Sequence, residues 1–252
     1  MNLHESTSYP ISPELRYRWY LAKDNPEALL RAGARTKNPW LKNVIQEKFF
    51  HLPNESVSVL DLACGAGFLS NDLSKEGYTV TGLDSDLGNL LLAREYDVTE
   101  AVKYVQGDLY RLPFEDESFD VVTCMDFLER SADPVAAIRE ASRVLKPRGI
   151  FAFHSLNRNW VAGLVMIKGM EYFVKNTPKN SHDFGLFLKP EEVEVCCKMN
   201  GLEPEKIVGL TPDVKTAAFW KMIAQRHVPD DFSFQVNDST KLAYLGYAVK
   251  VH

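Results

Sequence analysis

Cysteine is scarce in this chain, and its spacing suits neither a metal site nor a disulfide framework. The 252 residues include four cysteines, and no two of them are separated by two residues. Zinc sites and disulfide-rich domains need such spacing or a higher density of cysteine. We therefore interpret all four as small residues of the packed interior, as free cysteines commonly are. They are Cys64, Cys124, Cys196 and Cys197.

Long apolar runs and basic blocks are also lacking. No apolar run is long enough to span a bilayer, and residues 1 to 10 lack the basic and then apolar pattern of a signal peptide. We therefore expect a cytoplasmic protein. The net charge of −5 and the absence of any long stretch of lysine and arginine argue against nucleic acid as a partner. The length suits one α/β domain with additions at its ends.

A glycine turn at residues 59 to 67, Val-Leu-Asp-Leu-Ala-Cys-Gly-Ala-Gly, is the most informative stretch. It begins like the G-x-G-x-x-G pattern of dinucleotide folds, but Ser70 stands where the third glycine belongs. Asp61 would moreover face a bound pyrophosphate. Both features disfavour a nicotinamide or flavin site. The alternative that Gly65 and Gly67 only turn the chain, while Asp61 caps the next helix, stays open.

Two further carboxylates follow the same pattern. Asp84 closes the apolar run at 78 to 84, and Asp108 closes the run at 104 to 108. In a doubly wound sheet the carboxyl ends of such strands converge on one crevice, where ligands bind. Three carboxylates would repel a pyrophosphate but attract a ligand with ribose hydroxyls, an ammonium and a sulfonium. This pattern predicts S-adenosylmethionine.

The segments that follow continue the alternation of strands and helices. Residues 112 to 125 combine an acidic loop with an apolar strand, Asp133-Pro134 opens a helix, and residues 150 to 153 have the composition of a buried parallel strand. In this order the chain resembles the class I S-adenosylmethionine-dependent methyltransferases from about residue 44 to 156. The resemblance implies a Rossmann-like α/β fold, with a doubly wound, seven-stranded and mostly parallel sheet whose last strand is antiparallel.

The chain also divides by pattern into parts. We expect an N-terminal helical extension at residues 1 to 55, in which Asn38-Pro39 opens a helix that ends near His51. The methyltransferase domain should occupy residues 56 to 252 and carry an insertion at 157 to 190. Residues 242 to 251 alternate as an edge strand does.

The resemblance also implies which residues hold the cofactor. Two carboxylate oxygens suit a vicinal diol, so Asp84 would accept the ribose hydroxyls. Asp108 and Leu109 would meet the adenine, although a plain turn role for Asp108 stays open. The methionine part would lie against the glycine turn and Met125. The expected cofactor-binding residues are Asp61, Ala63, Gly65, Gly67, Asp84, Ser85, Asp108, Leu109 and Met125.

A closer resemblance begins after the fifth strand. Several motifs there match, in order and spacing, the ubiquinone-biosynthesis O-methyltransferases. Those enzymes methylate a catechol hydroxyl on a ring with a polyprenyl tail, so a lipophilic phenolic acceptor is implied. Methylation of another small metabolite, or cofactor binding without catalysis, stays open. The motifs are Ser155-Leu-Asn-Arg-Asn159, Gly169-Met-Glu-Tyr172, Pro178-Lys-Asn-Ser-His182-Asp183 and Phe187-Leu-Lys-Pro190.

One family motif is altered. The pattern Glu-x-x-Glu-His, linked in the family to a divalent metal, reads Asp126-Phe-Leu-Glu129-Arg130 here. Asp126 and Glu129 could still share a helical face and hold Mg²⁺. The guanidinium of Arg130 could instead replace the metal by stabilising a phenolate. A basic residue that the family has near Asn38 is present with a shift, as Lys42.

Proton removal from the acceptor needs a further group. A phenolic hydroxyl titrates near the tyrosine value of about 10, so a base or a cation must assist at neutral pH. His154, at the exit of the fifth strand, and His182, followed by Asp183, are the candidate bases. Together with Arg130 they form the expected catalytic set.

The insertion is rich in large apolar residues between 160 and 175. It suits a lid, a core or dimer-packing helix, or a helix that lies on a membrane surface, because apolar periodicity alone cannot separate these roles. In the membrane interpretation Lys168 and Lys175 lie near lipid headgroups, and the protein sits peripherally on the inner membrane face. The side chains expected to meet the bilayer are Trp160, Leu164, Met166, Ile167 and Phe173.

Overall fold

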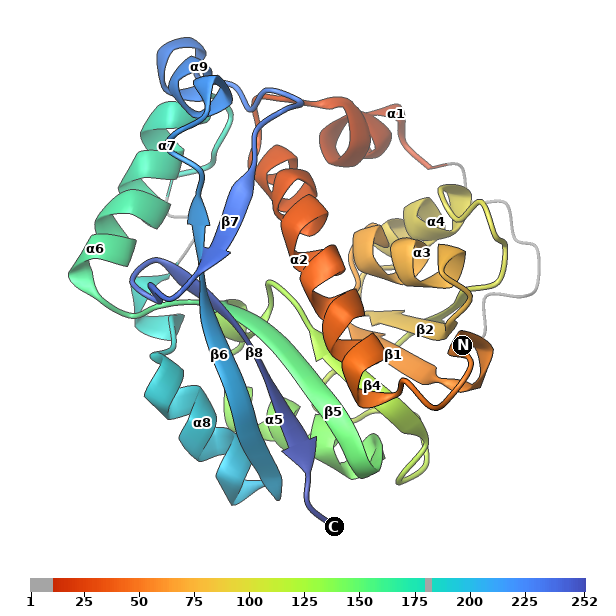
Figure 1. Cartoon of the computed structure of the whole chain (residues 1–252). Helices are drawn as coiled ribbons and strands as arrows, with labels where there is room; N and C mark the ends of the chain where they lie inside the picture. The colour runs from red at the N-terminus through yellow and green to blue at the C-terminus, as the bar shows by residue number, and fades with distance from the viewer. Residues whose placement is uncertain (1–10, 180–182) are drawn as a thin grey trace.

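The computed structural model describes residues 11 to 179 and 183 to 252 and shows one central sheet with helices on both faces (Figure 1). The strands are β1 (Ser58–Leu62), β2 (Thr79–Asp84), β3 (Lys103–Gln106), β4 (Phe119–Cys124), β5 (Leu145–Leu156), β6 (Leu202–Pro212), β7 (Phe234–Asn237) and β8 (Ala243–Lys250). The α-helices are α1 (Pro13–Arg16), α2 (Pro26–Lys48), α3 (Phe68–Lys75), α4 (Leu87–Glu95), α5 (Pro134–Val144), α6 (Trp160–Ala162), α7 (Met170–Phe173), α8 (Pro190–Met199) and α9 (Ala217–Gln225). Short π-helical segments span Tyr17–Leu21 and Gly163–Gly169, and 3-10 turns span Asn54–Ser56, Leu128–Arg130 and Phe184–Leu186.

The sheet confirms the doubly wound fold but has eight strands rather than seven. Its order is β3-β2-β1-β4-β5-β8-β6-β7. The first five strands pair in parallel, and β8 runs antiparallel to both β5 and β6. The extra strand is β7, a short edge strand antiparallel to β6. The carboxyl ends of β1 to β5 therefore meet at one edge, as a ligand site of this fold requires.

The last strand is not at the edge, and this corrects the prediction for residues 242 to 251. β8 lies between β5 and β6 and is hydrogen-bonded along both sides. Six of its eight positions are buried. Side chains of β8 pack into the apolar cores on both faces of the sheet, Tyr244 on one face and Tyr247 on the other, so the alternation in the sequence is not an edge signal.

Two apolar cores lie on opposite faces of the sheet. One holds side chains of α2, α3 and α4 against the strands, and the other holds side chains of α5 and α8. The first includes Leu41, Leu73, Leu90, Val121 and Ile150. The second includes Leu60, Ile138, Phe153, Val193 and Tyr244. The four cysteines are free thiols. Burial raises the pKa of each thiol, which keeps it protonated and suits a side chain that only packs.

Helix α2 runs without a break through Pro39, so the prediction of a helix that opens at Asn38 is wrong. The helix begins at Pro26, and the side chain of Asn25 caps it. An interior proline costs a helix about 3 kcal/mol. The buried face of α2 offsets this cost, and Asn38 helps by donating a hydrogen bond of 3.1 Å to the backbone oxygen of Phe68. Tertiary packing overrides the local break signal.

The insertion after β5 forms one helical stretch, from α6 to α7, at the upper left of Figure 1. Trp160 and Leu164 are 77% and 58% exposed. Met166 and Ile167, however, pack against the core beside β5, and Phe173 is half-buried. Of the five side chains expected to face a bilayer, only Trp160 and Leu164 are exposed, which corrects that prediction. In the part of the chain that the structure describes, no helix has the length and apolar character to cross a membrane.

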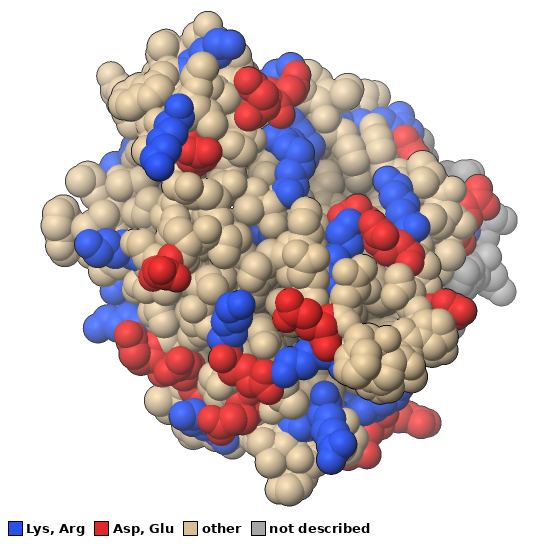
Figure 2. Space-filling model, in the orientation of Figure 1, with Lys and Arg blue, Asp and Glu red and all other residues tan. Residues whose placement is uncertain are grey.

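Charges are mixed on the surface. On the face shown in Figure 2, lysine and arginine lie among aspartate and glutamate without one dominant sign.

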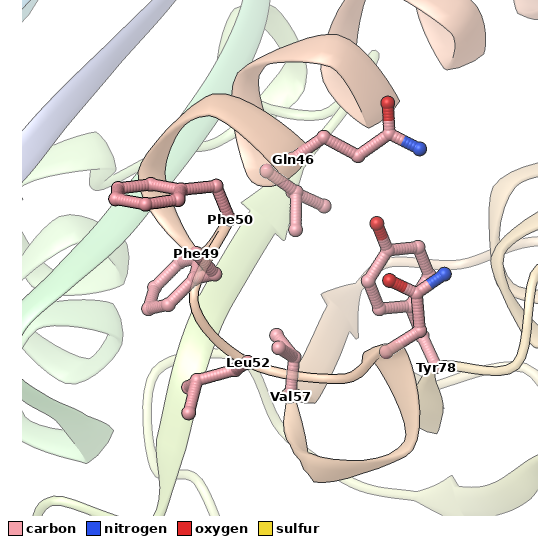
Figure 3. A pocket seen from close by; sticks show the side chains of 8 residues that line it. Gln46, Phe49, Phe50, Leu52, Val57 and Tyr78 are labelled. Carbon is pink, nitrogen blue, oxygen red and sulfur yellow. The ribbon is translucent and has the colours of Figure 1, made fainter.

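A hollow of about 260 Å³ lies between the end of α2 and the start of the sheet (Figure 3). Phe49, Val57 and Tyr78 are among its walls. It lies at the opposite edge of the sheet from the carboxyl ends.

Candidate functional site

The loop after β1 is a tight turn built on three left-handed residues. Ala63, Gly65 and Gly67 have φ angles of 54°, 53° and 79°. A side-chain carbon at Gly67 would lie 2.7 Å from the hydroxyl of Tyr104 and 2.8 Å from Cβ of Ala93, so only glycine fits there. Helix α3 begins at the next residue. The chain thus makes the sharp turn from strand to helix that the sequence predicts.

Asp84 reaches from the end of β2 to this loop. Its Oδ2 accepts a hydrogen bond of 2.9 Å from the backbone N–H of Gly65, and its Oδ1 accepts one of 2.9 Å from that of Asp86. An ionised carboxylate has about four acceptor positions. The backbone uses two of them, which leaves two for a ligand. This geometry fits a vicinal diol such as a ribose.

Asp61 is buried and ties three elements together. Its Oδ2 accepts a hydrogen bond of 2.6 Å from the hydroxyl of Ser70, and its Oδ1 one of 2.7 Å from that of Thr123. Burial raises the pKa of the Asp61 carboxyl to about 6, so the carboxylate prevails at neutral pH. Ser70, in the place of the third glycine of the dinucleotide pattern, therefore has a role of its own: it fixes Asp61 between β1 and α3.

An open hollow of about 610 Å³ lies at the carboxyl ends of β2 and β3. Small-molecule sites typically measure about 300 to 1,000 Å³. The hollow gathers Ser85, Asp108 and Leu109, three of the residues expected to bind the cofactor. Asp108 also accepts a hydrogen bond of 2.9 Å from the backbone N–H of Tyr110, so it acts as a turn residue too. The hollow suits an adenine beside an apolar side chain.

The N-terminal segment Tyr17–Leu21 covers the glycine loop. A side-chain carbon at Gly65 would lie only 3.3 Å from the ring of Trp19. Tyr20 donates a hydrogen bond of 2.6 Å from its hydroxyl to the backbone oxygen of Ala66. The sequence shows an aromatic cluster here but no pattern that places it on the loop. We did not predict this contact.

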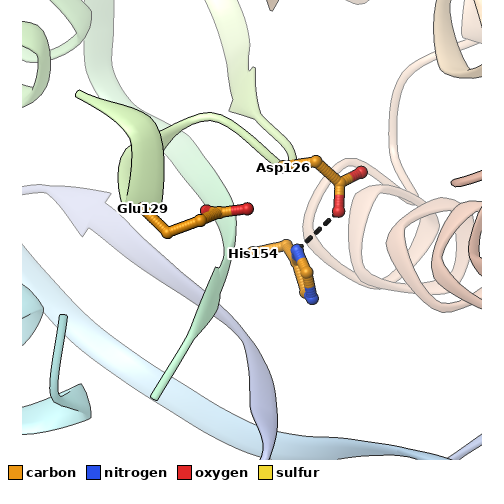
Figure 4. A group of neighbouring side chains, drawn as sticks. All are labelled: Asp126, Glu129 and His154. Atoms are coloured by element: carbon orange, nitrogen blue, oxygen red, sulfur yellow. Dashed lines mark ion pairs between the residues drawn. The ribbon is translucent and has the colours of Figure 1, made fainter. Parts of the chain in front are cut away.

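Asp126, Glu129 and His154 meet beside the end of β4 (Figure 4). One ligand-type atom from each lies within 4.8 Å of the others. Nδ1 of His154 is 2.8 Å from Oδ1 of Asp126, although the two groups lack the alignment of a hydrogen bond. Asp126 has a φ angle of 60°. Such rarely adopted backbone conformations concentrate at functional sites.

The cation of this cluster is Lys37, from α2. Its ammonium pairs with Oδ2 of Asp126, and its side chain is only 5% exposed. The lysine stem runs beside Gly33, where a side-chain carbon would lie 3.4 Å from Cε. Asn38, the next residue, anchors the helix to α3 through its hydrogen bond to Phe68. Helix α2 thus delivers a buried positive charge to the carboxylates.

The basic residue singled out in the sequence, Lys42, does not reach the cluster. It forms ion pairs of 2.9 Å with Glu76 and 3.5 Å with Asp72. Lys42, which the resemblance gives as the shifted basic residue of the family, thus pairs with carboxylates of α3 and Glu76 and not with the cluster. The sequence carries no local signal for Lys37, because its approach to Asp126 depends on how α2 packs against the sheet.

Opposite charges keep Asp126 ionised. Burial alone would raise the pKa of the Asp126 carboxyl, but Lys37 and His154 outweigh it and hold that pKa well below its usual value. Burial dominates at Glu129 and raises its pKa. Oε2 of Glu129 and both ring nitrogens of His154 have no hydrogen-bond partner among the described residues. Unpartnered polar atoms at buried positions are rare and favour a ligand site.

The other expected site residues lie elsewhere. Arg130 is exposed on the wall of the hollow beside Asp108, and it forms no ion pair with Asp126 or Glu129 within residues 11 to 179. The role foreseen for Arg130 at the acceptor stays a prediction, and the cation that pairs with Asp126 is Lys37. Met125 is half-buried. It packs against the core that holds side chains of α2, α3 and α4, and against the apolar side chains beside β5. His182 lies outside the described residues.

Known proteins resemble this chain in sequence and in fold. A methyltransferase domain family matches residues 60 to 153. The ubiquinone biosynthesis O-methyltransferase of Pseudomonas entomophila is 38% identical over 177 residues, 69% of this chain and 75% of that protein. The chain belongs to this methyltransferase family. The enzyme of the same name from Actinobacillus pleuropneumoniae is 35% identical over 193 residues, 73% of this chain and 80% of that protein.

Solved structures agree on the fold of this S-adenosylmethionine-dependent methyltransferase. A methyltransferase structure from Bacillus halodurans superposes with a TM-score of 0.61 at 22% identity and covers 84% of this chain and 99% of that chain. A Thermotoga maritima structure described as an S-adenosylmethionine-dependent methyltransferase gives 0.60 at 17% identity, with 88% and 92% covered. At these identities the likeness shows the fold alone.

Proposed function

We propose that this methyltransferase transfers the methyl group of S-adenosylmethionine to a hydroxyl of a catechol-type, lipophilic acceptor. The observation that supports this proposal is the pair of unpartnered acceptor atoms, Oε2 of Glu129 and Nε2 of His154, beside an ionised Asp126. Two adjacent hydroxyl groups of one ring would satisfy both. The relatives are named ubiquinone biosynthesis O-methyltransferases, and these names support a hydroxyl group as the acceptor.

The cofactor would lie between the glycine loop and the hollow. In this proposal the ribose hydroxyls take the two open acceptor positions of Asp84, and the adenine enters the hollow beside Asp108 and Leu109. The methionine part would meet Gly65 beneath Trp19. The remaining expected contacts are Asp61, Ala63, Gly67, Ser85 and Met125.

The chemistry needs alignment and one proton acceptor. Bound S-adenosylmethionine supplies a methyl group that its positive sulfur already activates. The acceptor oxygen would bond to the methyl carbon as the carbon–sulfur bond breaks, which would leave the spent cofactor as a neutral thioether. His154 takes the hydroxyl proton on Nε2, because Nδ1 faces Asp126. Asp126 stabilises the imidazolium that forms.

Catechols should be methylated in preference to monophenols. Losing one hydroxyl would leave Glu129 or His154 unpartnered, so kcat/KM should fall by on the order of 10- to 100-fold. Transfer of labelled methyl from S-adenosylmethionine to a catechol and to the matching monophenol measures this. Equal rates for the two, or methylation of amines and carboxylates only, would count against a catechol acceptor.

The insertion carries the features that support a lipophilic acceptor. Trp160 and Leu164 stand one helical turn apart and are exposed, and Lys168 follows at the same spacing. Arg226 lies over the ring of Tyr172, 5.5 Å from its centroid, where α9 adjoins α7. Exposed apolar groups near basic ones suit peripheral contact with an anionic membrane, from which a long-tailed acceptor would come. This would place the enzyme in the cytoplasm, on the inner membrane face.

Vesicle binding should therefore depend on the exposed pair of the insertion. The double variant Trp160→Ser/Leu164→Ser should bind anionic vesicles more weakly than the wild type, since apolar burial contributes about 25 cal/mol per Å². Cosedimentation with liposomes measures this. Phe50→Ser, which removes an 83% exposed ring at the far end of α2, is the matched control. If the wild type ignores vesicles, the insertion is a lid or a packing helix.

A further inference from the structure

The cluster of Asp126, Glu129 and His154 is where the family pattern leads one to expect a divalent metal. Three ligand-type atoms do converge there, within 4.8 Å. Oδ2 of Asp126 is already paired with Lys37, however, and Nδ1 of His154 lies 2.8 Å from Oδ1. Mg²⁺ prefers near-octahedral oxygen ligands and retained water, whereas one of these three donors is an imidazole nitrogen. The residues present therefore do not fit Mg²⁺.

We infer that the ammonium of Lys37 is a built-in cation that takes the metal's place in this methyltransferase. Asp126 and Glu129 are close to each other, and buried carboxylates need a counter-charge. Lys37 supplies it from inside the fold, because its side chain is only 5% exposed. A metal ion at Asp126 would meet that ammonium across a space that water cannot screen.

Lys37 acts here as a positioning residue. Its ammonium holds Oδ2 of Asp126, which leaves Oδ1 to face His154. The imidazole is thereby oriented with Nε2 toward the acceptor. This inference rests on the methyl-transfer role proposed above for His154. Binding of a metal, however, can be measured without any acceptor, so the two can fail separately.

The fold around Lys37 is built to keep the charge in place. The helix does not end at Pro39, and the hydrogen bond from Asn38 to Phe68 locks this turn of α2 onto α3. Gly33, one turn earlier, leaves the lysine stem a path along the helix. The ammonium of Lys37 helps to hold the pKa of Asp126 below its usual value, in keeping with the ion pair between them.

The first test is a titration of the full-length protein with Mn²⁺, followed by electron paramagnetic resonance. The wild type should show no stoichiometric Mn²⁺ site, and its turnover should survive treatment with EDTA. Stoichiometric Mn²⁺ binding by the wild type, or activity that EDTA abolishes and Mg²⁺ restores, would overturn the inference.

The second test removes the charge. Lys37→Met keeps most of the stem and should lower kcat by about 10- to 100-fold, while the affinity for S-adenosylhomocysteine stays unchanged. Lys37→Arg keeps the charge and should retain more turnover than Lys37→Met. Lys42→Met, on the same helix but paired at the surface, should behave as the wild type. Wild-type turnover in Lys37→Met would contradict the inference. If Lys37→Met does not fold, Lys37→Arg and the Mn²⁺ titration decide.

Discussion

Replacing His154 by glutamine should lower kcat by about 10²- to 10⁴-fold, the usual contribution of a general base. Glutamine has a similar length but cannot take a proton. The affinity for S-adenosylmethionine should stay within a few-fold of the wild-type value, because His154 contacts Asp126 and not the glycine loop. Steady-state kinetics with a catechol, together with calorimetry of cofactor binding, measure both quantities.

Two matched variants make this result interpretable. Asp126→Asn keeps the shape of the side chain that faces His154 but removes its charge, so it should lower kcat in the same direction. His51→Gln removes an exposed histidine at the end of α2 and should leave kcat unchanged. A His154→Gln enzyme that keeps more than half of its turnover would show that the base lies elsewhere, and His182 would then be the next candidate.

Replacing Asp84 by alanine should weaken S-adenosylmethionine binding by a few kcal/mol. Each charge-assisted hydrogen bond contributes about 1.5 to 3 kcal/mol, and Asp84 has two open acceptor positions for the ribose. A loss of about 2.7 kcal/mol corresponds to a 100-fold rise in Kd. Calorimetric titration with S-adenosylmethionine measures this change directly.

The variant also removes the hydrogen bond from Gly65, so a second substitution is needed to separate the two effects. Asp84→Asn keeps an oxygen for that N–H but loses the charge and one acceptor, and it should fall between the wild type and Asp84→Ala. Asp238→Ala, at an exposed carboxylate near β7, is the control for loss of charge alone. Unchanged affinity in Asp84→Ala, or tight NAD binding by the wild type, would contradict the assignment.

The sequence predicts the first half of the sheet well because its signals are local. The strand that leads to Asp61, the glycine turn and the proline at the start of α5 each depend on neighbours in the chain. The second half depends on distant partners. Whether residues 243 to 250 lie at an edge or between two strands is decided by β5 and β6, and no local pattern reports that.

The site likewise has one part that local sequence signals predict and another that depends on distant packing. Gly65, Asp84 and Asp108 follow successive strands, so topology alone brings them to one edge. Lys37 and Trp19 come from the N-terminal helices, and only the packing of those helices on the sheet brings them to the site. Sequence reasoning found the carboxylates of the cluster but not Lys37, the cation that pairs with Asp126.

The cover that Trp19 forms over Gly65 has a consequence for the pace of catalysis. If the methionine part of the cofactor lies against Gly65, every round of methyl transfer must end with the used cofactor leaving from under that ring. The segment Tyr17–Leu21 then has to part from the loop once per turnover, and the hydrogen bond of Tyr20 to Ala66 has to break. The rate of that parting is an upper limit on turnover, however reactive His154 becomes. Where this opening limits turnover, substitutions in Tyr17–Leu21 would raise kcat, and substitutions near His154 would not.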